Sequence, residues 1–114
     1  MEDNDYFIYL GETLIGVAKD VEPDQPNMVG LFEPMPEFDK VKHLFDKEYE
    51  LILGSRSKER REVMDEIFAL GLRLECKRTG EIIKSIPGKM PGLTFRNEIA
   101  YLHIHNSKVW WRCM

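Results

Sequence analysis

The sequence predicts a single α+β domain over residues 1–114, with an antiparallel sheet built from β-hairpins and two consecutive helices packed on one face. Two neighbouring segments in the middle of the chain have helical periodicity, and segments with strand-like alternation lie on both sides of them. Short turns that contain glycine or asparagine separate these strand segments. A chain of 114 residues, 43% of them hydrophobic, is also large enough to build one packed core.

The first part of the chain predicts a β-hairpin after a disordered acidic leader at residues 1–5. Gly11 and Glu12 separate two segments rich in strand-forming residues, and glycine at the first position of a two-residue connection favours a type II′ turn. Residues 20–27 contain two prolines and three acidic residues, and they are predicted to form an acidic loop. The predicted strands are residues 6–10, 13–19 and, after the loop, 29–33.

The two helices are predicted from their ends and from their apolar stripes. The first begins at Pro34 or Pro36, because a first helical turn does not use the amide hydrogen that proline lacks. Residues 49–53 fit either its last turns or a strand. The second helix has Ser57 as its N-cap and ends at Gly71. The apolar stripe of the first helix consists of Phe38, Val41, Phe45 and Tyr49.

The rest of the chain predicts two more hairpins. The first of them turns at Thr79 and Gly80, and residues 87–92 form a loop after it. The second turns at Asn106 and Ser107. The strands of these hairpins are residues 72–77 with 81–86, and 99–105 with 108–113.

The last hairpin carries the candidate binding site. With a two-residue turn, His105 lies opposite Lys108, and the pairing continues as far as Ala100 opposite Cys113. One face then has the composition of a core: Ala100, Leu102, Ile104, Val109, Trp111 and Cys113. The opposite face has Lys108 together with aromatic rings and a guanidinium group, which are enriched at binding hot spots. The candidate binding residues are Tyr101, His103, His105, Trp110 and Arg112.

Two questions stay open for this face: what covers Trp110, and whether the register is the predicted one. Trp110 is covered by a partner, by a second copy of the chain, by a ligand, or by another part of its own domain. A change of register by one residue would exchange the two faces of the hairpin and remove the argument.

No metal, cofactor or catalytic residue is predicted. His103 and His105 project to the same side of a strand, and imidazoles are good zinc or iron ligands, but two ligands do not make a site. A third ligand would have to come from His43, Glu98 or a cysteine, and the sequence does not place any of these nearby. No serine or cysteine stands in a recognisable nucleophile motif. We therefore expect a protein that is not an enzyme.

The charge of the chain is unevenly distributed and suggests a partner. Residues 1–50 contain 13 acidic and four basic residues, a net charge of −9, whereas residues 51–114 have a net charge of +5. An acidic surface with no catalytic motif favours a protein-interaction module, for example an inhibitor or immunity-type protein that masks a basic partner, or a chain that binds its own copy. The predicted acidic partner surface is Asp20, Glu22 and Asp24.

Two other functions remain as alternatives. The terminal hairpin face also suits a small-ligand or metal-binding domain. Basic residues after Glu50, together with Tyr101 and Trp110, suit single-stranded nucleic acid, which binds through stacking and backbone cations. The pI near 5.4 makes nucleic acid the less favoured partner.

The expected location is the cytoplasm. No apolar run approaches the ~20 residues that span a bilayer, and the first residues lack the basic and then apolar order of a signal peptide. Two cysteines are also too few for the disulfide framework of a small secreted domain. The Gly30–Pro34 junction and the histidine-containing last hairpin resemble parts of small bacterial domains, a resemblance that implies no activity and no site residue.

Overall fold

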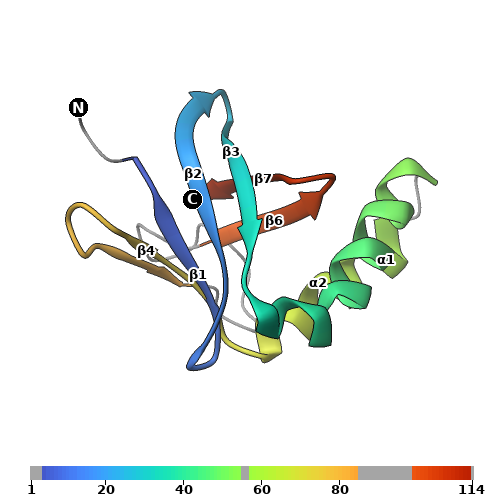
Figure 1. Cartoon of the computed structure of the whole chain (residues 1–114). Helices are drawn as coiled ribbons and strands as arrows, with labels where there is room; N and C mark the ends of the chain where they lie inside the picture. Colours follow the sequence, from blue (N-terminus) through green and yellow to red (C-terminus); the bar gives the residue numbers. More distant parts are fainter. Residues whose placement is uncertain (1–3, 55–56, 85–98, 114) are drawn as a thin grey trace.

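The computed structural model describes residues 4–54, 57–84 and 99–113, and these residues form an α+β fold (Figure 1). Seven antiparallel strands make one curled sheet in the order β5-β4-β1-β2-β3-β7-β6. Two α-helices, joined by one short 3₁₀ helix to the sheet, complete the fold. Among the described residues, no helix combines the length and the apolar character needed to cross a bilayer.

The first hairpin has the predicted turn. β1 (Tyr6–Leu10) pairs with β2 (Thr13–Asp24), and Gly11 between them has a φ of +62°, which suits glycine at this position of a type II′ turn. Asn4 accepts a hydrogen bond from the Val21 amide, and Asp5 accepts one from the Lys77 amide. These two residues of the predicted leader are therefore held by the sheet, and residues 1–3 lie outside the described residues.

The acidic loop predicted over residues 20–27 is wrong, because β2 continues to Asp24 and β3 (Asn27–Pro34) begins three residues later. The pairing shifts between Lys19 and Glu22, and Asp20 at this irregularity has a φ of +53°. β1 pairs with β2 only as far as Ala18, so beyond it β2 has β3 as its strand neighbour. Such a one-sided strand tolerates Pro23, which has no amide hydrogen to donate.

The first predicted helix is in fact two, and the first of them begins at Pro36, one of the two predicted starts. Pro34 ends β3, and a 3₁₀ helix, η1 (Pro36–Lys40), is followed by α1 (Lys42–Leu53). The Phe38 amide donates a hydrogen bond to the Met35 carbonyl, and the Val41 amide donates one to the Phe38 carbonyl. These hydrogen bonds span three residues, as in a 3₁₀ helix, and they separate η1 from α1. Residues 49–53 are the last turns of α1 and not a strand.

The second helix, α2 (Ser57–Ala69), ends before Gly71 as predicted, and Gly71 has a φ of +88°. The prediction of Ser57 as its N-cap concerns a side chain that lies outside the described part. α1 packs on α2 and against β6, and α2 also contacts β4. Together the two helices cover one face of the curled sheet, and their apolar residues join the sheet's core: Leu44, Phe45, Val63, Met64, Ile67 and Phe68.

The last two hairpins form as predicted where the structure describes them. β4 (Leu72–Cys76) pairs with β5 (Ile82–Lys84), and β4 alternates between buried and half-buried residues. Residues 85–98, with the loop predicted at 87–92, lie outside the described residues. β6 (Ile99–His105) pairs with β7 (Lys108–Cys113).

The register of the last hairpin is as predicted over most of its length. His105 pairs with Lys108 and Tyr101 with Arg112, and the two turn residues both have positive φ values, 48° and 62°. Near its open end the pairing shifts, so that Ile99 and not Ala100 lies opposite Cys113. Ala100 is accordingly half-buried and not in the core, which corrects the prediction for that residue. The remaining predicted core residues with described side chains are buried: Leu102, Ile104, Val109 and Trp111.

Candidate functional site

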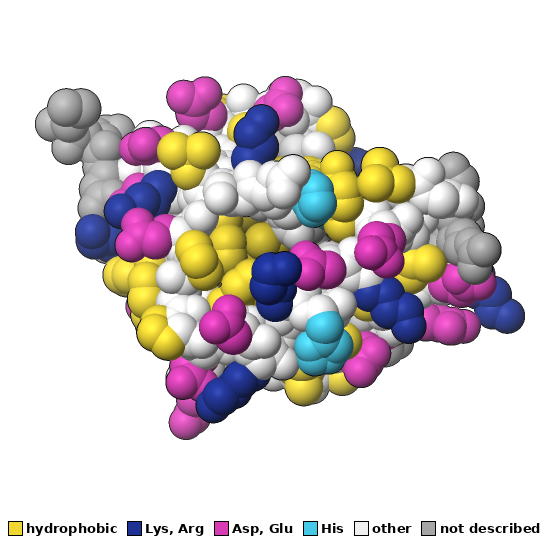
Figure 2. All heavy atoms as spheres, turned by 45° about the vertical axis from the view of Figure 1, so that its right-hand side comes forward, with side chains coloured by type: hydrophobic (Ala, Val, Ile, Leu, Met, Phe, Trp, Pro, Cys, Tyr) yellow, Lys and Arg dark blue, Asp and Glu magenta, His cyan; other side chains and the backbone are white. Residues whose placement is uncertain are grey.

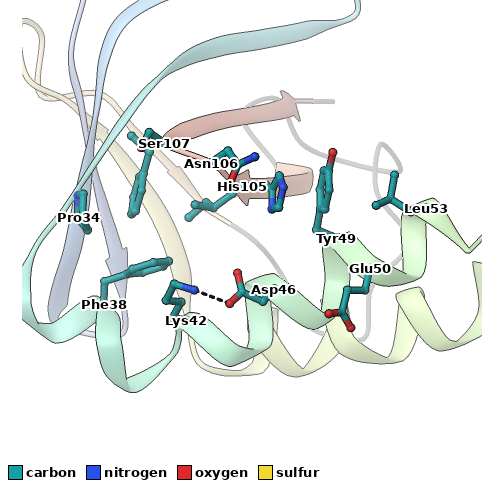
Figure 3. A pocket seen from close by; sticks show the side chains of 12 residues that line it. Pro34, Phe38, Lys42, Asp46, Tyr49, Glu50, Leu53, His105, Asn106 and Ser107 are labelled. Atoms are coloured by element: carbon teal, nitrogen blue, oxygen red, sulfur yellow. Dashed lines mark hydrogen bonds and ion pairs between the residues drawn. The ribbon is translucent and has the colours of Figure 1, made fainter.

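An open cleft of about 530 Å³ lies between α1, η1, the end of β3 and the β6–β7 turn (Figure 3). We call it the α1 cleft. The side of the molecule that carries the helices shows a hollow lined with hydrophobic side chains beside basic and acidic groups (Figure 2). Its apolar lining comes from both the helices and the sheet: Phe32, Pro34, Phe38, Tyr49, Leu53 and Ile104.

Polar groups lie on two opposite sides of the α1 cleft. On the helix side, Lys42 donates a hydrogen bond of 2.6 Å to Asp46, one turn further along α1. On the sheet side, Asn106 and Ser107 form the β6–β7 turn (Figure 3). An apolar hollow with a few polar groups at its edges is typical of binding sites, which have volumes of about 300–1,000 Å³.

The wall of the cleft is a stack of two rings. Tyr49 of α1 lies flat against His105 of β6, with ring centroids 3.8 Å apart and an interplanar angle of 7° (Figure 3). The sequence identified His105 as a candidate binding residue but missed Tyr49. Tyr49 was assigned to the apolar stripe of its helix, and a tyrosine at the end of such a stripe is the signal that could have indicated a site at the edge of the core.

Three of the other predicted site residues continue from this stack as a row of rings. Trp110 packs edge-on against Tyr49 at 5.9 Å and lies 5.3 Å from His103, whose ring is 4.9 Å from that of Tyr101. The Tyr101 hydroxyl donates a hydrogen bond to Asn27 Oδ1 on β3. Arg112 is half-buried, lies opposite Tyr101, and is not among the residues that line the cleft.

The predicted binding face is therefore largely covered by its own domain. Trp110, Tyr101 and His105 are half-buried and His103 is buried, because α1 packs against this side of β6. Of the five predicted residues, only His105 borders the α1 cleft. The alternative in which another part of the domain covers Trp110 is the one that the packing supports.

A buried carboxylate lies beside this row of rings. Glu48 of α1 has a side chain that is only 1% exposed, and its Oε1 lies 2.6 Å from Nδ1 of His103, whose side chain is 8% exposed. The approach is close enough for an ion pair but does not have the geometry of a hydrogen bond, and neither oxygen of Glu48 has a hydrogen bond to the described residues. Glu48 was not predicted from the sequence, although an acidic residue within an apolar helical stripe is an available signal.

A small hollow of about 80 Å³ lies next to Glu48 and His103, and its lining also includes Arg60 and Arg61. Arg61 pairs with Asp65 at 3.3 Å. Basic residues near the start of α2 oppose the helix dipole, but these two arginines line the same hollow as the Glu48 carboxylate.

The described residues do not gather a metal site. No group of three or more histidine, cysteine, aspartate or glutamate side chains is placed to hold an ion in the described ranges. His43, a third ligand considered from the sequence, is exposed on α1, and Glu98 lies in the part that the structure does not describe.

The predicted acidic partner surface is accessible. Asp20, Glu22 and Asp24 are all exposed on the outer part of β2. Asp20 and Glu22 border a second hollow of about 290 Å³, together with Lys108 and Leu31, which is 55% exposed. Carboxylates beside an exposed leucine suit a partner that is both basic and apolar.

Two other features belong to the fold and not to a site. Arg73, one of the basic residues that suggested nucleic acid, lies over the Tyr9 ring at 4.3 Å and donates a hydrogen bond to the Gly11 carbonyl. Burial acts to raise the pKa of the Cys76 thiol, but hydrogen bonds, led by those from Thr79, lower it below its ordinary value. Cys76 does not line any of the hollows described above.

Comparison of the chain with protein-family models, with curated proteins and with solved structures found no significant match.

Proposed function

We propose that this protein is a non-catalytic interaction module that binds a segment of another protein in the α1 cleft. It is expected to work in the cytoplasm. The observation that carries the proposal is the open cleft of about 530 Å³ whose rim holds Leu53, a leucine that is 70% exposed. An exposed leucine beside a stacked tyrosine and histidine is typical of a binding surface, because covering such apolar and aromatic groups lowers the free energy.

The polar groups of the cleft support binding more than catalysis. Lys42 and Asp46 pair with each other at 2.6 Å, so each charge is already compensated. His105 lies flat against Tyr49, which favours a role as a contact surface. The hydrophobic side chains in the hollow are also visible from outside, so a partner segment can reach them (Figure 2).

Leu53→Asp should abolish binding of a protein segment to the cleft. Peptides selected from a random phage-displayed library on the wild-type protein are measured by calorimetry against the variant. We expect a loss of more than about tenfold, or about 1.4 kcal/mol, because a charge replaces an apolar contact at the rim of the cleft. Bound peptides should also shift the NMR signals of the His105 ring.

The matched control is Ile82→Asp, which places the same charge at another exposed aliphatic residue, on β5. It should change the dissociation constant by less than about twofold. Peptides that bind equally to wild type and to Leu53→Asp would exclude the cleft as their site. Shifts of His105 with small molecules, but with no peptide, would favour the small-ligand alternative.

A second candidate function uses the acidic surface of Asp20, Glu22 and Asp24 to mask a basic partner. The exposed Leu31 beside two of these carboxylates supports it, because it adds an apolar contact to the charges. Reversing the charges should weaken binding of an arginine- and lysine-rich peptide by about tenfold at low salt. The variant combines Glu22→Lys and Asp24→Lys with Asp20→Asn, since asparagine tolerates the positive φ at that position.

The control for this variant makes the same change in net charge at exposed glutamates elsewhere, with Glu12→Gln, Glu62→Lys and Glu66→Lys. Fluorescence anisotropy of a labelled peptide measures both variants. An equal loss in both would mean that net charge alone attracts the peptide, which would remove the acidic surface as a specific site.

A further inference from the structure

We propose that the partner segment of the α1 cleft carries a basic residue next to an apolar one. This inference rests on the proposed function and specifies its ligand: the apolar side chain covers Leu53 and the stacked rings, and the cationic group lies at Glu50. Three features of the described residues lead to this partner chemistry.

The first feature is the row of charges that α1 presents to the cleft. Lys42, Asp46 and Glu50 are spaced four residues apart and all three line the cleft. Lys42 and Asp46 form an ion pair at 2.6 Å. Glu50 is exposed, and its carboxylate has no side-chain partner among the described residues. The cleft therefore keeps one negative charge that a ligand can compensate.

The second feature is the end of the helix. Glu50 lies in the last turn of α1, where the helix dipole places partial negative charge, and that turn contains no basic residue. The Gly54 amide donates a hydrogen bond to the Glu50 carbonyl but leaves the Glu50 carboxylate free. The carboxylate and the dipole thus favour a cation at the same place.

The third feature is the distance between the acidic and the apolar contacts. Glu50 and Leu53 are three residues apart on one helix, which puts their β-carbons about 5–6 Å from each other. Tyr49 is adjacent, and it is stacked on His105. An apolar side chain and a basic side chain that are neighbours in a partner segment can reach both contacts at once.

A charge exchange tests this inference. The probes are the library-selected peptides whose binding Leu53→Asp removes, and for each a copy in which the basic residue is replaced by glutamate. Calorimetry measures both peptides against wild type and against Glu50→Arg. We expect the glutamate copy to bind wild type at least about tenfold more weakly, and Glu50→Arg to reverse this preference. Light scattering of the unliganded protein shows whether a second copy of the chain occupies the cleft instead.

The matched control is Glu81→Arg, which makes the same change in net charge at an exposed residue between β4 and β5. It should keep the preference of the wild type. Peptides that bind the cleft without a basic residue, or equally well to Glu50→Arg, would overturn this inference and leave the proposed function standing. A chain that binds no peptide in the cleft, or that fills the cleft with its own copy, would overturn both.

Discussion

His103→Leu should destabilise the protein by about 3–5 kcal/mol, and the double variant Glu48→Leu/His103→Leu should recover most of that loss. The single replacement removes the ring nitrogen that lies 2.6 Å from Glu48 Oε1 and leaves the Glu48 carboxylate buried without that contact, since its side chain is only 1% exposed. Removing both members replaces a buried polar pair by two apolar side chains, which is often neutral or stabilising. Urea unfolding of the wild type and the three variants gives the coupling free energy.

The two single variants should differ from each other. Glu48→Leu removes the carboxylate, so that only the His103 ring nitrogen loses its contact, and we expect a smaller loss of about 1–3 kcal/mol. Glu66→Leu, at an exposed acidic residue of α2, serves as the control and should change stability by less than about 0.5 kcal/mol. Strictly additive effects of the two leucine replacements would contradict a direct interaction between Glu48 and His103.

This pair also bears on the α1 cleft. Glu48 and Tyr49 are neighbours on α1, while His103 and His105 lie two apart on β6, so two adjacent contacts join the same helix to the same strand. The buried pair thereby helps to hold the stacked wall of the cleft in place. The double leucine variant, if it is as stable as the wild type, separates this positioning effect from overall stability.

Local patterns predicted most of the elements. Alternation and turn residues gave the hairpins, including the pairing of His105 with Lys108, because a two-residue turn sets the register of its own strands. The extension of β2 to Asp24 was missed because two prolines argue against a strand when its neighbours are unknown. The neighbours are β1 on one side, only as far as Ala18, and β3 on the other.

The candidate site was harder to predict because it depends on contacts between distant parts of the chain. His105 was found from the composition of one strand face. Tyr49 and Glu48 come from a helix more than 50 residues earlier, and no local pattern indicates that this helix docks on β6. For the same reason the sequence could not determine that the face with Trp110 is covered by α1. Long-range packing, and not local propensity, decides which polar residues meet.

The two adjacent tryptophans should respond very differently to truncation. Trp111 is fully buried in the core and packs edge-on against Tyr6 at 5.4 Å, whereas Trp110 is half-buried in the row of rings. Trp111→Ala should cost about 3–5 kcal/mol of stability, because it leaves a large cavity among well-packed side chains. Trp110→Ala should cost about 1–2 kcal/mol of stability, because the Trp110 ring is only partly buried and loses less contact area. Urea unfolding followed by circular dichroism measures both.

Phenylalanine variants test the same difference without a large cavity. Trp111 Nε1 is buried and has no hydrogen-bond partner among the described residues. Trp111→Phe removes this unsatisfied donor, so it should lower the stability by less than the loss of side-chain volume alone would imply. In Trp111→Phe the remaining Trp110 fluorescence should be quenched by acrylamide, and in Trp110→Phe the remaining Trp111 should be protected. Readier quenching of Trp111 than of Trp110, or a larger loss of stability for Trp110→Ala than for Trp111→Ala, would mean that the two faces of the β6–β7 hairpin are exchanged. The site around Tyr49 and His105 would then have no basis, since it requires His105 and Trp110 to share one face.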